Sequence, residues 1–545
     1  MKDQRLNKLI IDPVAALIAL LTNHQQMASG PLMMLVFDEA SNLSVGMIAS
    51  IRRLFRLLRT MPIWGIFLST YNCTPHLQLG IRSDSSARIR TECLKRHHPF
   101  LGLQLDVELN HRLSAKFQQE MGKPLSQFAT PDHLTLFGRP LWRLYANSSL
   151  SKLQGFVEMK ILGGTKLFNP LNRNHVFAVL ASRICLDACT HSDECTKLVA
   201  TAVHSHLRLV VAMDEKRSMF TSITPSEPIV AHAAASLLME RDMNHQVLHT
   251  CPYGWSTAIS TLTNALLYPG LVEKGLRGEL FARIIFVVSR DILLGSLNNE
   301  AAIINWSSHF SLLKFFGSLL SADLAEQLEN FKPNIRRRNA DLNENDFATE
   351  FSDALANFNH FTTTSAFLAP ELIPQLLHDL LRQCAGLQLC FTQPAWDLLF
   401  PTYHGSLSDP FDQTLLSAVV VQVKNTKKKN TLRLGVAERS YFARLHRPVI
   451  GILLDLGSAP GEPQFQYIPS VGGQGPPFWG IHLLGCGAET FGALLDLNLA
   501  HACRSLLRAV TCPESDTLNV EISRLNARFN FLALEDRFPG CIPQL

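Results

Sequence analysis

The sequence predicts a multi-domain α/β protein, and three features lead to this prediction. The chain has 545 residues, which is too long for one compact core and enough for about three domains. A strand, a helix and a second strand follow one another near the N-terminus, as in a doubly wound sheet. Strands and helices alternate again in the last two hundred residues, and the residues between read as mostly helical. We expect domains at residues 1–120, 121–335 and 345–545.

Composition indicates a packed globular chain. Hydrophobic residues make up 47% of the sequence and charged residues 18%, which excludes a disordered protein. The formal charge of +4 is small for this length, so any surface for nucleic acid must be local. Twelve Cys are scattered without a compact framework, which is typical of reduced thiols in a cytoplasmic or nuclear protein.

The N-terminal apolar run does not read as a targeting segment. Asp12 and Pro13 divide it, and a helix opened by Asp12 is the better interpretation. No apolar stretch approaches the ~18–20 residues that a membrane span needs. We therefore expect no signal peptide, no transmembrane segment and no membrane partner.

The first domain is expected to hold two strands of a parallel sheet. Residues 31–43, PLMMLVFDEASNL, form an apolar run typical of a strand buried on both faces. An Arg-rich helix is expected at 51–59, and residues 63–72, IWGIFLSTYN, read as the second strand.

Polar residues at these strand ends have the pattern of a nucleotide site. Asp38 and Glu39 follow the first strand as in a Walker B motif, in which the acids act on Mg²⁺ and on the attacking water. Thr70 follows the second strand, where a γ-phosphate sensor lies in that fold. A solvated acidic turn is the alternative interpretation.

A phosphate-binding loop is the missing part of this pattern. Such a loop needs Gly-x-x-x-x-Gly-Lys-Ser/Thr before the Walker B strand, and the 37 residues before Asp38 contain no such sequence. We therefore expect an incomplete NTPase-like layer with vestigial nucleotide residues and no ATP binding. Too little chain precedes strand 32–37 to cover both of its faces, so apolar surface should remain exposed on it.

The last domain is expected to begin with a helix at 372–383. Short strands should follow near 387–392, 395–402, 415–425, 448–456 and 479–485, and a final helix near 489–509. The polar segment before this domain, residues 330–345, is expected to contain the main domain boundary.

The segment VVVQVKNTKKKN, residues 419–430, places polar side chains in an apolar strand. Side chains alternate between the two faces of a strand, so Gln422 and Lys424 share one face. A buried ammonium is costly unless it is paired. The strand either lies at an edge with one solvated face or carries these two groups to the rim of a site. Asp397, in QPAWDLLFP, poses the same question in an earlier strand.

The order Asp397, then Gln422-x-Lys424 on the face of one strand, resembles the PD-(D/E)xK nuclease superfamily. The helix at 372–383 would be its first core helix. The resemblance implies that Asp397 and Gln422 hold Mg²⁺ or Mn²⁺, helped by the carbonyl of Val423. Lys424 would position or activate water and offset charge on the phosphorane.

Gln422 departs from the more common acid at its position, and an amide oxygen is a weaker Mg²⁺ ligand than a carboxylate. A further acid on a helix would strengthen the site, and Asp379 and Glu371 are the candidates. The loop Lys427-Lys428-Lys429 either contacts phosphates or is simply solvated.

The layout of the whole chain resembles the fungal Crinkler-like proteins, which are related to the retrotransposon-hotspot type. That family combines an AAA/STAND-like NTPase with a PD-(D/E)xK nuclease-like domain. The resemblance implies an intracellular effector or conflict protein that acts on nucleic acid. The alternative is a non-catalytic remnant that serves as an interaction or decoy protein. The segments that carry the resemblance are LMMLVFDEAS, FLST, FGRPLW, PSEPIVAHAAASLL, GLRGELFAR and WDLLFP followed by VVVQVKN.

Overall fold

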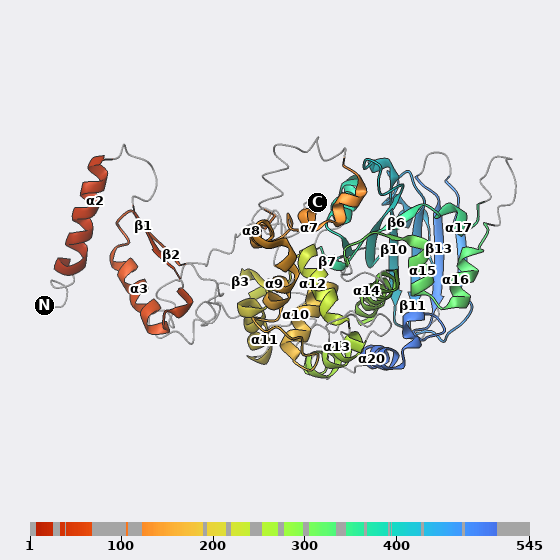
Figure 1. Ribbon diagram of the computed structural model, residues 1–545, viewed down its shortest axis with the longest axis horizontal. Coiled ribbons are helices and arrows are strands. Elements are labelled where there is room, and N and C mark those ends of the chain that lie inside the picture. Colours follow the sequence, from red (N-terminus) through yellow and green to blue (C-terminus); the bar gives the residue numbers. More distant parts are fainter. Residues whose placement is uncertain are drawn as a thin grey trace. The chain divides into compact units, whose positions relative to one another are not determined.

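The computed structural model shows a mixed α/β protein that divides into two compact units (Figure 1). Unit 1 comprises residues 1–99 with two short pieces, 203–205 and 213–219, and unit 2 comprises the rest of the chain. The structure describes residues 7–24, 33–38, 40–67, 105–106, 123–188, 193–213, 220–239, 253–270, 277–297, 305–333, 345–364, 368–390, 393, 395–426, 430–470 and 475–508. Within them, none of the helices is long and apolar enough to cross a membrane.

Unit 1 contains the strand, helix and strand that the sequence predicts. Strand β1 (Met33–Phe37) pairs in parallel with β2 (Ile63–Phe67), and α3 (Val45–Leu57) connects them. The helix begins after Ser44, whose hydroxyl accepts a hydrogen bond from the Met47 N–H at 3.2 Å. This is an N-cap of the kind that serine favours. Helix α2 (Asp12–His24) begins at the predicted residue.

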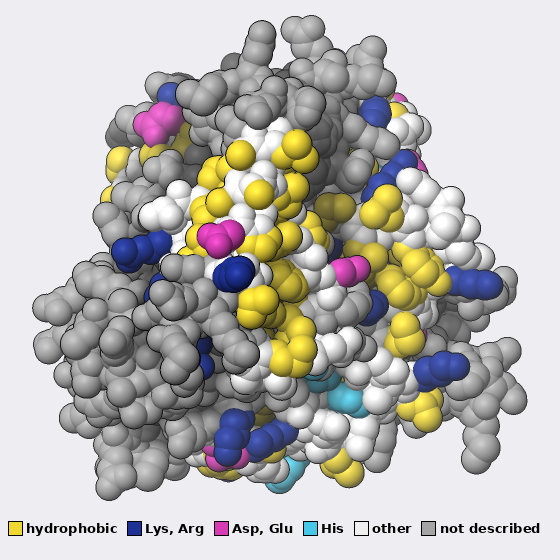
Figure 2. Space-filling model, turned by 90° about the vertical axis from the view of Figure 1, so that its left-hand side faces the viewer, with side chains coloured by type: hydrophobic (Ala, Val, Ile, Leu, Met, Phe, Trp, Pro, Cys, Tyr) yellow, Lys and Arg dark blue, Asp and Glu magenta, His cyan; other side chains and the backbone are white. Residues whose placement is uncertain are grey.

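Only one face of this two-stranded sheet is covered in the described residues. Phe55 of α3 packs so closely on Gly65 that a Cβ there would lie 2.4 Å from its ring. On the opposite face the side chains of Met34, Val36 and Trp64 are 59%, 56% and 63% exposed. This confirms the predicted apolar surface on strand 32–37. Figure 2 shows one face of the molecule, on which hydrophobic side chains gather in a vertical band.

Unit 2 is built on a nine-stranded mixed sheet in the described part of the chain. The strands run in the order β12-β13-β11-β10-β9-β6-β5, with β8 also paired to β9 and β7 paired to β8. Strands β8, β9 and β10 are antiparallel in turn, β10, β11 and β13 are parallel, and β12 is antiparallel to β13. Their bounds are β5 Phe310–Ser311, β6 Ala354–Ala356, β7 His360–Thr363, β8 Ala385–Gln388, β9 Leu398–His404, β10 Leu416–Lys424, β11 Val449–Asp455, β12 Gln464–Ile468 and β13 Phe478–Leu484.

The helices of unit 2 lie mainly before the sheet in sequence. A small second sheet pairs β3 (Leu209–Met213) with β4 (Phe220–Ile223) in the region that was expected to be mostly helical. The α-helices are α7 Pro131–Leu134, α8 Pro140–Ser149, α9 Leu153–Ile161, α10 Arg173–Ile184, α11 Asp193–Ser205, α12 Pro228–Leu238, α13 Tyr253–Thr261, α14 Arg277–Leu297, α15 Leu312–Leu319, α16 Ala322–Glu329, α17 Phe347–Glu350, α18 Ile373–Arg382, α19 Val436–Ser440 and α20 Leu497–Arg508.

Both faces of the large sheet are buried. Along β10, Val419 and Val421 belong to the core that includes α14, whereas Ala418 and Val420 belong to the core that includes α18. A strand covered on both faces needs apolar side chains at every position. This explains the continuous valine run in the sequence.

The predicted boundary at 330–345 does not separate domains. Helices before it and strands after it lie in one unit and share one core. Phe286 of α14, for example, packs edge-on against Phe400 of β9 with ring centroids 5.9 Å apart. The polar composition of residues 330–345 therefore marks a connection between elements, because the earlier helices cover one face of the later sheet.

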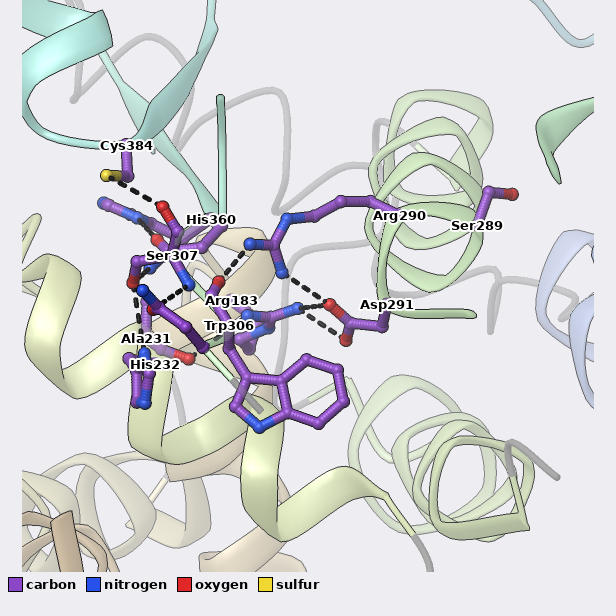
Figure 3. A network of polar contacts seen from close by, with 12 residues as sticks. Arg183, Ala231, His232, Ser289, Arg290, Asp291, Trp306, Ser307, His360 and Cys384 are labelled. Atoms are coloured by element: carbon purple, nitrogen blue, oxygen red, sulfur yellow. Dashed lines mark hydrogen bonds and ion pairs between the residues drawn. The ribbon is translucent and has the colours of Figure 1, made fainter. Parts of the chain in front are cut away.

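A buried polar network fixes α14 in this core (Figure 3). Arg183 of α10 donates two hydrogen bonds to the carboxylate of Asp291, at 2.7 and 2.6 Å. Arg290 also donates to Asp291, at 2.8 Å, and to the carbonyl of Trp306. All three charged side chains are fully buried. Because each bond has a fixed direction, the network sets the rotation of α14 about its own axis.

Candidate active site

Strands β8, β10 and β11 end at the same end of the sheet, and β9 begins there. The β9–β10 register pairs Leu398 with Val421, and Asp397 is the residue just before β9. The Asp397 N–H donates to the carbonyl of Val421 at 2.8 Å, and its Oδ2 accepts from the Val423 N–H at 2.6 Å. Asp397 is thus held against the strand segment that carries Gln422 and Lys424.

Asp397 is partly buried and lies near an opposite charge. Burial raises the pKa of Asp397, while the Val423 amide and the Lys424 ammonium act in the opposite direction. Lys424 and Gln422 are both only partly exposed. Lys424 is therefore close enough to Asp397 to stabilise its charged form, as the predicted pairing requires.

A second carboxylate, Glu279, joins the site from the first turn of α14. The pKa of Glu279 is raised to about 7, chiefly by burial and then by the nearby charge of Asp397. A hydrogen bond from Gln388 and the charges of Arg283 and Lys424 lower it. Lys424 therefore acts on both carboxylates, which come from chain segments far apart in sequence.

Gly278 permits this approach. A Cβ at Gly278 would lie 3.1 Å from Val423 Cγ1 and 3.3 Å from Asn425 Cβ. Both distances are shorter than ordinary van der Waals contact, so a larger residue would press α14 away from the end of β10. Glycine thereby brings Glu279 to the strand that carries Gln422 and Lys424.

Gln388 supports Glu279 from the last position of β8. Its Nε2 donates to Glu279 Oε2, whereas its Oε1 is buried and has no hydrogen-bond partner within the described residues. A buried acceptor without a partner is costly in a folded protein. Such an atom beside two carboxylates is typical of a site rather than of an ordinary core.

The two helix acids expected from the sequence do not join this cluster. Asp379 accepts a hydrogen bond from Gln375 within α18 at 3.1 Å. The pKa of Asp379 is raised to about 6 by burial, against the opposing effects of Gln375 and Arg382, and neither of these two partners belongs to the site. Glu371 is exposed just before α18. Glu279 was missed because its sequence segment, GLRGELFAR, contributed to the resemblance only as a whole.

The donor atoms at this site suit a hard divalent cation. Mg²⁺ and Mn²⁺ prefer oxygen ligands, and the cluster offers the carboxylates of Asp397 and Glu279. The side-chain oxygen of Gln422 and the carbonyl of Val423 are the further ligands that the nuclease resemblance implies. In the described ranges, no group of three or more His, Cys, Asp or Glu side chains is placed to hold a metal. A cation here would therefore depend on two acids and on neutral oxygens.

A further polar contact lies next to Lys424, at the end of β11, between Asp455 and Asn430. Asp455 is the register neighbour of Lys424 and is fully buried. It accepts from the Asn430 backbone N–H at 2.8 Å and from Asn430 Nδ2 at 3.0 Å. These bonds hold Asn430 against the end of β11. Asn430 follows the lysine loop, residues 427–429, which lies outside the described residues.

Of the nucleotide residues expected in unit 1, only Asp38 is described. It follows β1 directly and is exposed. Glu39 and Thr70 lie outside the described residues, so the NTPase-like pattern stays a prediction.

One comparison with known proteins gives a match. Residues 168–305 match the family model of a domain of unknown function (DUF8736). The matched range runs from just before α10 to just after α14 and so includes Glu279, but it ends before the large sheet. No curated protein and no solved structure matches the chain.

Proposed function

We propose that unit 2 is a metal-dependent phosphodiesterase of the nuclease type. The observation that carries this proposal is the close approach of α14, at Gly278, to Val423 of β10, whose N–H holds Asp397. There the charges of Glu279, Asp397 and Lys424 act on one another. Two carboxylates brought together repel each other, and buried acids with raised pKa values concentrate at functional sites. The chain order of helix, Asp397 strand, hairpin and Gln422-x-Lys424 strand agrees with the resemblance to the nuclease superfamily.

Each residue has a role that follows from its contacts. The Val423 amide orients Asp397, and Gln388 orients Glu279. Asp397 and Glu279 would hold Mg²⁺ or Mn²⁺, which supplies charge to polarise a phosphoryl oxygen. Gln422 is the further ligand that the nuclease resemblance implies. Lys424 provides a fixed positive charge where negative charge develops on the phosphorane oxygens.

The test compares cleavage of DNA and of RNA with Mn²⁺ by wild type, Asp397→Asn, Lys424→Ala and Glu279→Gln. Removing one preorganised charge of this kind typically costs about 10²–10³ in rate, so each variant should lose that much. Asp379→Asn is the matched control, because Asp379 is also a buried acid but lies outside the site. Melting temperatures confirm folding. Equal cleavage by the wild type and the three site variants would reject the assignment.

The alternative, a non-catalytic remnant, is favoured by Gln422 and by the small number of acids in the cluster. A folded wild type that cleaves neither nucleic acid and gains no melting temperature from Mn²⁺ would support it. For unit 1 we propose no ATP binding by this chain, because its sequence contains no Gly-x-x-x-x-Gly-Lys-Ser/Thr loop.

A further inference from the structure

The crossover between β10 and β11 carries a local excess of positive charge. Residues 424–447 contain eight Lys or Arg side chains and a single acidic one, Glu438. Their formal charge of +7 exceeds the +4 of the whole chain, so all other residues together amount to −3. A polyanion responds to such a local field rather than to the net charge.

The crossover turns its apolar side chains toward the sheet. Leu432 and Leu434 lie against Gly480, where a Cβ would be 2.8 and 2.7 Å from their methyl groups. The ring of Phe442 packs on that of Phe478, with centroids 5.9 Å apart. This apolar side anchors the segment, and it leaves the opposite side for the basic residues.

Four arginines of the crossover are described, and two of them face solvent. Arg433 and Arg444 are exposed, and Arg439 and Arg447 are partly exposed. Among the residues that the structure describes, none of these four guanidinium groups forms an ion pair. Their charges are therefore not offset by a carboxylate in direct contact.

The crossover begins at the candidate site and extends along β10. Its start is bonded to Asp455, the register neighbour of Lys424. Its middle accepts a hydrogen bond from Trp396, the residue before Asp397, through the carbonyl of Glu438 at 3.2 Å. Its end, Arg447, accepts from Ser417 near the start of β10 at 3.3 Å. At ~3.3 Å per residue, β10 spans about 30 Å.

We propose that the exposed side of residues 430–447 binds the sugar-phosphate backbone of a nucleic acid and leads it to the site at Lys424. The choice of partner rests on the proposed function. Guanidinium groups suit phosphates because they donate two parallel hydrogen bonds and keep their charge. A row of them ending at a phosphodiester site would hold several phosphates of one strand.

The test measures binding apart from cleavage. Labelled single-stranded DNA, RNA and duplex DNA are titrated with the full chain in EDTA, over a series of NaCl concentrations. The variant Arg433→Gln/Arg444→Gln removes the two exposed guanidinium groups. The control Lys152→Gln/Lys166→Gln removes two exposed charges from the helical part of unit 2.

Loss of two phosphate contacts should weaken binding several-fold at low salt. It should also reduce the slope of log affinity against log salt by about 0.9 per contact for duplex DNA. The control should change neither quantity. An unchanged affinity and slope in Arg433→Gln/Arg444→Gln would overturn the inference. So would a wild type that binds vesicles of phosphatidylserine and phosphatidylcholine but no nucleic acid.

The two proposals can fail separately. Binding that depends on Arg433 and Arg444, without cleavage in Mn²⁺, would keep this inference and remove the proposed nuclease activity. Cleavage that depends on Asp397 and Lys424, with binding unaffected by the arginine substitutions, would keep the proposed nuclease activity and remove this inference.

Discussion

At the scale of single residues, Glu279 and Asp397 show how the site departs from an ordinary protein interior. Burial raises the pKa of both carboxyl groups, and each is held by one hydrogen bond from a neighbouring strand. Charging both without a cation is unfavourable because like charges repel. Lys424 offsets part of this cost, and a divalent cation would offset more. Protonation and cation binding should therefore compete at Glu279.

The raised pKa of Glu279 makes the stability of the fold depend on pH. The pKa of Glu279 rises from an ordinary 4.5 to about 7 in the fold, so the folded state binds this proton more tightly than the unfolded state. Stability from this group is complete below about pH 4.5 and is lost as the pH rises toward about 7. In EDTA, the melting temperature of the wild type should fall more steeply across this window than that of Glu279→Gln.

Other acids titrate in the same pH range, so the difference between the wild type and Glu279→Gln isolates the contribution of Glu279.

Mn²⁺ added at pH 8 should raise the melting temperature of the wild type and have little effect on Glu279→Gln or Asp397→Asn. Parallel pH profiles for wild type and Glu279→Gln would show that Glu279 keeps its ordinary pKa.

At the scale of elements, α14 links the core to the site. Its first turn carries Glu279, and three turns later Arg290 and Asp291 join the buried network with Arg183 (Figure 3). Arg183 and Arg290 both pair with Asp291 there. Within the drawn network, Asp291 is the only negative charge that offsets these two positive charges. The helix cannot turn without breaking these bonds, and for this reason Glu279 keeps its place at β10.

Asp291→Asn should therefore be strongly destabilising. The substitution leaves two buried guanidinium groups without a counter-charge, and breaking a buried pair in this way costs about 3–5 kcal/mol. Asp132→Asn is the matched control, since Asp132 pairs with Arg143 at a side chain that is 72% exposed. Exposed pairs contribute about 0–1 kcal/mol. Urea unfolding measures both, and equal losses would contradict the assigned role of Asp291.

At the scale of the whole molecule, the helices of unit 2 that precede residue 330 and the strands that follow residue 345 share one hydrophobic core. The face of β10 that carries Val419 and Val421 is buried by helices that precede residue 330. Unit 1, by contrast, is a separate compact unit, and all residues of the candidate site belong to unit 2. Activity and fold should therefore follow unit 2 as a whole.

Fragments test this directly. Residues 345–545 alone should be insoluble or lack a cooperative thermal transition, because one face of the sheet loses its helices. Residues 100–545 should fold and keep the Mn²⁺-dependent rise in melting temperature. Circular dichroism and thermal denaturation measure both. A cooperative transition in the 345–545 fragment would mean that the helices are not needed for its fold.

The sequence by itself determined much of this protein. Period-two and continuous apolar patterns located β1, β2, β10, β11 and β13, because strand periodicity is a local property of the chain. Asp397 and the Gln422-x-Lys424 pair stood out because polar groups in apolar strands are costly.

Tertiary structure decided the rest. Short strands such as β5 and β6 have too few residues for a periodic signal and exist through pairing with β9 and its neighbours. Only packing shows that residues 330–345 join parts of one core, since composition reports solvent exposure and not which elements meet. Glu279 belongs to the site because Gly278 lets α14 approach Val423, a contact between segments far apart in the chain. Local sequence patterns report only on residues that are close in the chain. The interaction between two carboxylates depends instead on their distance in space, which the fold determines.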